Sequence, residues 1–260
     1  MTVEPLPSLD AHAHLSLSSS GVELARSGAV LAMTTSLEEA DLAVGRREPL
    51  VIWGPGCHPR KVQSQQAFEA GRFRALCEPT AVVGEIGLDM GSRLYGCAPL
   101  DLQVRNFRQA LEVLASMPRL VSIHSYHATR QVLDELRRRP IRVPVLHWWT
   151  GTAAETREAV ALGCCFSVHS AVARQSKFRS HVPPDRLLVE SDHGYNDPPA
   201  AIPCRVEWVE HLVGQQYGLE AAEVRRLVWL NLAAIVRETG TRSLLPDQMG
   251  AILDAASGDR

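Results

Sequence analysis

The chain has 260 residues, of which 45% are hydrophobic and 22% are charged, and this composition excludes the disordered and fibrous classes of protein. Its formal net charge of -2 leaves no broad basic face, which excludes a protein that holds nucleic acid only by neutralising phosphates. No stretch reaches the roughly 18 to 20 apolar residues that a membrane-spanning helix needs, so we predict no association with a membrane.

Short apolar runs alternate along the chain with more polar stretches of helical spacing, which predicts parallel strands joined by crossover helices. The eight runs span residues 8–15, 28–34, 51–57, 81–86, 120–125, 143–148, 163–168 and 186–192. Several are too continuously apolar for a sheet with one wet face, which favours a barrel wall covered by helices. Because such barrels commonly take about 250 residues, we predict an α/β fold in which residues 1–260 form a single (β/α)8 TIM-type barrel domain.

The clearest helix is expected after the fourth run, where apolar side chains recur at intervals of three and four residues: Leu100, Val104, Phe107, Leu111 and Leu114. This stripe predicts a helix that packs against the barrel. The segment before it, residues 87–99, is the longest irregular piece, and we expect a lid or a substrate contact there.

Further helices are expected on either side of the last strands. One begins at Thr129, whose hydroxyl can cap it, and stops before Pro140. Two more are expected over residues 205–217 and 220–239, and a short last helix follows Pro246.

Histidines and acids lie at the ends of the predicted strands: His12, His14, Glu85, His124, His147 and Asp192. His12 and His14 are two residues apart, so on a strand both side chains point to the same side and can share a metal. In a closed barrel the carboxyl ends of the strands meet at one mouth, where this fold places its active sites. A single histidine at a strand end is more often structural, but the whole set in barrel order predicts a site for two divalent metal ions with Glu85 between them.

Several segments together resemble the TatD-type metal-dependent deoxyribonucleases: LDAHAHL (9–15), GCHP (56–59), GEIGLD (84–89), IHS (123–125), HWWTG (147–151) and LLVESD (187–192). The resemblance runs in order from about residue 8 to Asn231, and GEIGLD and the final ESD are its most specific parts. That family is a branch of the amidohydrolase-like barrels, and its members remove nucleotides from DNA, in some cases RNA, with divalent ions such as magnesium.

The resemblance implies two ligand sets that share one carboxylate: His12, His14, Glu85 and Asp192 for one ion, and Glu85, His124 and His147 for the other. It also implies that Asp192 acts as general base. His58 would match a family histidine near the scissile phosphate, although a lone histidine before a proline could equally be structural. Magnesium, manganese and zinc all suit histidine and carboxylate ligands, so the ligand types leave the metal open.

The sequence departs from the family pattern near the predicted mouth. Tyr126 and His127 follow the fifth strand where the family usually has an arginine and an aspartate, so a phosphate clamp is missing or rebuilt. Trp148 and Trp149 replace a cysteine and a phenylalanine. Their rings could stack on bases, or at least one could pack under the adjacent helix. The candidate substrate contacts are therefore His58, Tyr126, Trp148 and Trp149.

The leading hypothesis is a metal-dependent exonuclease on the end of single-stranded DNA or RNA, because the predicted site is a mouth and not an open groove. A second is another amidohydrolase-like enzyme, such as a lactonase, phosphotriesterase or deaminase. Glu85 argues against it, since phosphotriesterase-like relatives need a lysine there. A third is a nuclease-like subunit of a multi-protein antiviral assembly. The six cysteines form no CxxC pair and no signal peptide is visible, so we expect a cytoplasmic protein.

Overall fold

Each predicted apolar run matches one strand of the computed structural model, which describes residues 5–24, 26–91, 97–175, 182–194 and 205–258. The strands are β1 (Leu9–Ala13), β2 (Ala29–Met33), β3 (Val51–Gly54), β4 (Val82–Gly87), β5 (Leu120–His124), β6 (Pro144–Leu146), β7 (Cys165–Val168) and β8 (Leu187–Val189). Part of the predicted irregular segment 87–99, residues 92–96, lies outside the described residues.

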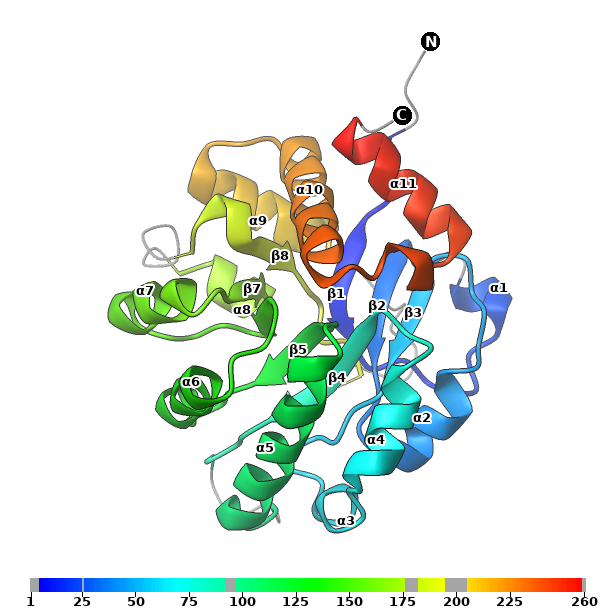
Figure 1. The fold of residues 1–260 in the computed structure, drawn as a ribbon. Helices are drawn as coiled ribbons and strands as arrows, with labels where there is room; N and C mark the ends of the chain where they lie inside the picture. The colour runs from blue at the N-terminus through cyan, green and yellow to red at the C-terminus, as the bar shows by residue number, and fades with distance from the viewer. Residues whose placement is uncertain (1–4, 25, 92–96, 176–181, 195–204, 259–260) are drawn as a thin grey trace.

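The strands are parallel and follow chain order, as the sheets β1-β2-β3 and β4-β5-β6-β7-β8. Backbone hydrogen bonds join these sheets at both seams. Beyond β3, the Cys57 N–H donates to the Glu85 carbonyl of β4 at 2.8 Å. Beyond β8, the Asp192 N–H donates to the His12 carbonyl of β1 at 3.0 Å. The fold is therefore the predicted (β/α)8 barrel, and Figure 1 shows the strands at the centre with helices around them.

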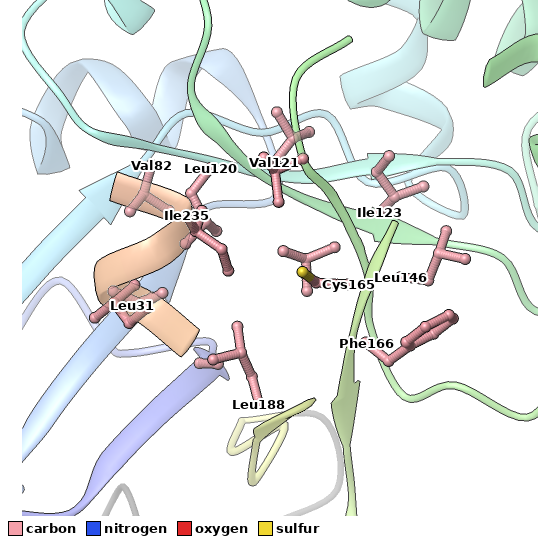
Figure 2. Packing of buried hydrophobic residues seen from close by; sticks show 14 of the residues in the cluster. Leu31, Val82, Leu120, Val121, Ile123, Leu146, Cys165, Phe166, Leu188 and Ile235 are labelled. Carbon is pink, nitrogen blue, oxygen red and sulfur yellow. The ribbon is translucent and has the colours of Figure 1, made fainter. Parts of the chain in front are cut away.

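Buried hydrophobic side chains fill the space between strands and helices. Figure 2 labels part of this core: Leu31, Val82, Leu120, Val121, Ile123, Leu146, Cys165, Phe166, Leu188 and Ile235. Every residue of β2 and β4 is buried, which explains why their sequences are apolar with little alternation. Helix α10 (Ala221–Thr239) contributes Ile235 to the same core and packs on β1, β5 and β8.

Helix α5 (Leu100–Ser116) carries the predicted apolar stripe, of which Phe107, Leu111 and Leu114 are buried. Two polar residues of this helix, Gln103 and Asn106, are buried as well. The helix therefore presents both apolar and polar groups to the interior, which the apolar spacing alone does not predict.

Helix α6 (Thr129–Arg138) begins at the predicted residue, but the predicted cap is wrong. Ala128 occupies the N-cap position and no side chain caps the helix. Thr129 already stands inside the first turn, where its hydroxyl cannot reach the free N–H groups that an N-cap side chain satisfies.

The other predicted helices are present as α9 (Glu207–Tyr217), α10 and α11 (Asp247–Ser257). The remaining helices connect the strands: α1 (Gly21–Leu24), α2 (Leu37–Ala43), α3 (Val62–Gln66), α4 (Ala70–Cys77), α7 (Ala153–Ala161) and α8 (Ser170–Ala173), with 3-10 turns η3 (Pro184–Arg186) and η4 (Arg242–Leu244). Among the described residues, no helix has the length and apolar character to cross a membrane.

Candidate metal centre

The strand ends bring the six predicted ligand side chains together at one mouth of the barrel. His12 lies on β1 with His14 directly beyond it, Glu85 lies on β4, His124 ends β5, and His147 and Asp192 follow β6 and β8. Residues far apart in the sequence meet here because parallel strands in a ring all end on the same side.

The first group of ligand atoms comes from the two ends of the strand order. His12 Nε2 and His14 Nε2 lie 3.3 Å apart, because residues two apart on a strand project to the same side. Asp192 Oδ1 lies 3.5 Å from His12 Nε2 and 3.6 Å from His14 Nε2. These atoms are close enough to share one cation.

Glu85 lies between this group and a second one. Its Oε2 atom is 3.2 Å from His14 Nε2, whereas its Oε1 atom is 2.5 Å from His124 Nδ1 and 2.8 Å from His147 Nε2. His58 Nε2 also lies 3.2 Å from Glu85 Oε2, and His58, Glu85 and His124 form another group able to hold a cation. One carboxylate therefore offers an oxygen to each side of the cluster.

Three buried polar atoms of the cluster have no hydrogen-bond partner among the described residues: Glu85 Oε2, His147 Nδ1 and Asp192 Oδ1. A buried carboxylate oxygen without a donor is costly, and native structures rarely leave one unsatisfied. A cation among these imidazoles would satisfy the two carboxylate oxygens. The residues present thus fit a bound divalent metal.

The protonation of the cluster is set by Glu85. Burial raises the pKa of its carboxyl, but the nearby imidazoles, foremost His58 and His147, outweigh burial and hold that pKa well below its usual range. Burial lowers the pKa of His14 and His124, but Glu85 more than compensates and raises both. Glu85 and Glu190 together overcome burial and raise the pKa of His147 well above its usual value.

Two other groups respond mainly to burial. The pKa of His12 is well below its usual value, because burial and the neighbouring His147 both disfavour its charged form. Burial also raises the pKa of Asp192 to about 7. With this pKa, the Asp192 carboxyl can take up and release a proton at neutral pH.

Hydrogen bonds orient the two imidazoles of the first strand. His14 Nδ1 donates to the Met33 carbonyl at 3.0 Å, so Nε2 is the nitrogen that can offer a lone pair to the cluster once the ring is neutral. His12 Nδ1 lies 2.7 Å from Ser122 Oγ, and its Nε2 likewise faces the cluster. A hydrogen bond to one ring nitrogen leaves the other nitrogen as the candidate metal-binding atom.

Two carboxylates that we did not predict support the other imidazoles. His124 Nε2 donates to Asp89 Oδ2 at 2.8 Å, so its Nδ1 atom faces Glu85. His147 Nδ1 lies 3.5 Å from Glu190 Oε1. Asp89 and Glu190 belong to the GEIGLD and LLVESD segments, which stand out in the sequence. The spacing of residues in those segments does not indicate which histidine each carboxylate contacts.

Glu190 and a further buried acid, Asp10, also join neighbouring strands. Glu190 accepts hydrogen bonds from the Trp148 N–H at 2.7 Å and from the Ser167 hydroxyl. Asp10 accepts from the Ser191 N–H at 3.0 Å and from the Ser191 hydroxyl, which ties β1 to the segment after β8. Burial raises the pKa of Asp10 to about 7.

The candidate substrate residues lie in different environments. Tyr126 is exposed just beyond β5, and Trp148 is partly exposed with its ring stacked on His169 at a centroid distance of 3.9 Å. Trp149 is buried, and its Nε1 donates to Thr156 Oγ1 of α7 at 2.9 Å. Trp149 therefore packs under the adjacent helix, and we do not propose it as a substrate contact.

Comparisons with known proteins agree with this architecture. Residues 9–237 match the family described as TatD related DNase. A Cronobacter turicensis protein named 3'-5' ssDNA/RNA exonuclease TatD is 31% identical over 70% of this chain and 74% of its own length. An uncharacterized metal-dependent hydrolase TatD from Mycobacterium tuberculosis is 29% identical over 80% of this chain and 91% of its own length.

A solved structure has the same fold. The TatD homolog YJJV from Escherichia coli K12 superposes with a TM-score of 0.74 at 19% identity, over 88% of this chain and 97% of that one. The barrel, its cluster of histidines and carboxylates, and these relatives place the chain in the class of metal-dependent hydrolases. The chain belongs to the TatD related DNase family, as its motifs predicted.

Proposed function

We propose that this chain is a divalent-metal-dependent phosphodiesterase that removes nucleotides from the 3′ end of single-stranded DNA or RNA. The observation that carries the proposal is the pair of buried carboxylate oxygens, Glu85 Oε2 and Asp192 Oδ1, that lack hydrogen-bond partners among the described residues yet lie among imidazoles. The polarity and the choice of a single strand are supported by the name of the Cronobacter relative.

The cluster offers ligands for two ions, with magnesium the physiological choice and manganese or zinc as substitutes. His12, His14, Glu85 and Asp192 would hold one ion, and Glu85, His124 and His147 the other. When bound, such cations lower the pKa of a water molecule and neutralise charge on the phosphoryl oxygens.

The chain's own groups supply the remaining chemistry. Asp192 would accept the proton of the attacking water, since burial raises its pKa to about 7. His58 Nδ1 accepts a hydrogen bond from the Arg60 N–H at 3.1 Å, and burial lowers the pKa of His58 to about 3. The neutral ring therefore carries its proton on Nε2, so it would donate to a phosphoryl oxygen rather than bind a cation.

Aromatic rings beside the cluster would hold the bases. Trp148 and Tyr126 follow β6 and β5, the same strands that supply His147 and His124. Stacking on an aromatic ring contributes about 1 to 3 kcal/mol per base and tolerates any sequence. This suits an enzyme that removes successive nucleotides.

We also propose that residues 1–260 act as one domain and that the protein works in the cytoplasm. The five described cysteines are all free, and free thiols are typical of reducing compartments.

The sharpest test compares single-stranded oligonucleotides that differ only in their ends. Metal-free protein reloaded with magnesium should shorten a linear strand, and it should leave a circular strand of the same sequence intact. A blocked 3′ end should protect the linear strand, whereas a blocked 5′ end should not.

Asp192→Asn is the companion variant, because it keeps the size of the side chain and removes the proton acceptor. It should bind the ion at His12 and His14 more weakly, because a neutral amide replaces a charged ligand, and it should not cleave even at saturating magnesium. Cutting of the circular strand would contradict the exonuclease proposal, and wild-type cleavage by Asp192→Asn would contradict the role of Asp192.

A further inference from the structure

We propose that helix α5 positions the metal centre from outside the barrel, through the buried side chains of Gln103 and Asn106. The two residues are three apart on one face of the helix. A chain of hydrogen bonds connects each of them to a different histidine beside Glu85. This inference rests on the proposed function, since it concerns the residues that would hold the cations and contact the phosphate.

The first connection runs from Gln103 to His124. Gln103 Oε1 accepts from the Asp89 N–H at 2.8 Å, and Gln103 Nε2 donates to the Asp89 carbonyl at 3.1 Å and to the Ala98 carbonyl at 2.8 Å. One side chain therefore holds both main-chain polar groups of Asp89. The Asp89 carboxylate accepts from His124 Nε2 at 2.8 Å and from the Gly91 N–H at 2.8 Å.

The direction of this hydrogen bond matters for a cation. Because His124 donates through Nε2, its Nδ1 atom is the one that can offer a lone pair beside Glu85 Oε1. A displaced Asp89 would free the ring to rotate or to adopt the other tautomer. Gln103 is thus a positioning residue that acts on His124 through Asp89.

The second connection runs from Asn106 to His58. Asn106 Nδ2 donates to the Gln65 carbonyl at 2.7 Å and to Gln65 Oε1 at 2.9 Å. With its oxygen held in this way, the Gln65 amide must direct Nε2 away from α5, and Nε2 donates to the Cys57 carbonyl at 2.9 Å and lies 3.4 Å from the His58 carbonyl. Asn106 and Gln65 together hold the segment that carries His58.

The two connections give opposite orientations to the rings beside Glu85. His58 takes a backbone hydrogen bond on Nδ1 and presents an N–H through Nε2, whereas His124 donates through Nε2 and presents Nδ1. One ring can act as a donor and the other as a ligand. Both orientations depend on α5, through Gln103 and Asn106. These two side chains and that of Gln65 on α3 are buried.

The test uses Gln103→Met and Asn106→Leu, with Asn231→Leu as the matched control. Asn231 is also a buried asparagine whose Nδ2 donates to two carbonyls, those of Pro184 and Leu187, but these lie at the start of β8, away from the mouth. Its loss should reduce stability by a similar amount without touching the cluster.

Manganese binding to the metal-free protein is the first readout. Gln103→Met should weaken it by up to roughly 10-fold, the low end of what loss of the supporting partner Asp89 itself would cost, and Asn231→Leu should leave it unchanged. The second readout is the ring ¹⁵N spectrum of His58. Wild type and Asn231→Leu should show the neutral tautomer protonated on Nε2, and Asn106→Leu should show a mixture of tautomers.

Wild-type manganese affinity in Gln103→Met, or a wild-type His58 spectrum in Asn106→Leu, would overturn the proposal. If either variant fails to fold, Gln103→Ala and Asn106→Ala remove the same hydrogen bonds, leave room for water at the freed backbone groups, and carry the same expectations. Neither readout uses a nucleic acid, so failure to cleave DNA would contradict the proposed function without deciding this one. If the wild type bound no manganese, the His58 spectrum would still test the role of α5.

Discussion

His12 and His147 stack their imidazole rings with centroids 4.0 Å apart and planes 8° apart, although they come from β1 and from the end of β6. Two charged rings would repel at this distance. Burial and His147 lower the pKa of His12, whereas Glu85 and Glu190 overcome burial and raise the pKa of His147. Without metal, the stacked pair therefore consists of a neutral His12 ring and a charged His147 ring.

Metal binding should release protons near neutral pH. The pKa values of His14, His124 and His147 are raised, so these rings are protonated in the metal-free protein and must lose protons before they can bind a cation. Metal affinity should therefore rise as the pH increases through these raised pKa values and fall as it decreases. Calorimetric titration with manganese, in two buffers of different ionisation enthalpy, measures the protons released. An uptake of protons, or none exchanged, would contradict the protonation described for the cluster.

Glu190→Gln should weaken metal binding although Glu190 is not one of the proposed ligands. Glu190 holds the Trp148 N–H and lies beside His147 Nδ1, and a neutral amide there removes the charge that supports this ring. Loss of such a partner typically costs roughly 10- to 100-fold in metal affinity.

Ser167→Ala is the control for this variant, because it removes a hydrogen bond to the other oxygen of Glu190 and leaves His147 in place. It should change manganese affinity far less. Equal effects of the two substitutions would show that the charge of Glu190 beside His147 is not what supports metal binding.

The adjacent tryptophans should differ in what they contribute. Trp148→Ala should raise KM for a single-stranded oligonucleotide by roughly 5- to 150-fold, the equivalent of about 1 to 3 kcal/mol of base stacking, with little change in thermal stability. Trp149→Ala should instead lower the free energy of unfolding by about 3 to 5 kcal/mol, because its ring is buried and packs on Phe166. Steady-state kinetics and thermal melting of both variants separate these roles. An unchanged KM in Trp148→Ala would remove it from the substrate site.

The strands could be predicted from the sequence because each is a short run buried on both faces, as β2 and β4 show. The order of those runs was enough to place His12, Glu85 and Asp192 at a common mouth. The start of α6 was also predictable, but not its missing cap, since propensity favours Thr129 as a cap and the chain places Ala128 there.

The residues that orient the candidate ligands could not be predicted, because their contacts depend on tertiary geometry. Asp10 contacts Ser191 although they are 181 positions apart in the sequence, and Gln103 contacts Asp89 from a helix whose spacing suggests only an apolar face. From the sequence alone, a polar residue on such a helix is expected to be exposed to solvent. Its burial is explained only by the strand end that it contacts in the folded chain.

The most direct measurement of the central claim is magnesium-dependent cleavage of a labelled single-stranded oligonucleotide by metal-free protein, with Glu85→Gln compared against Glu210→Gln. Both glutamates are buried, but Glu210 pairs with Arg225 on the outer helices and not with the cluster. We predict that wild type and Glu210→Gln cleave only when magnesium is restored, and that Glu85→Gln does not cleave. Cleavage without added metal, or cleavage by Glu85→Gln at the wild-type rate, would contradict the account.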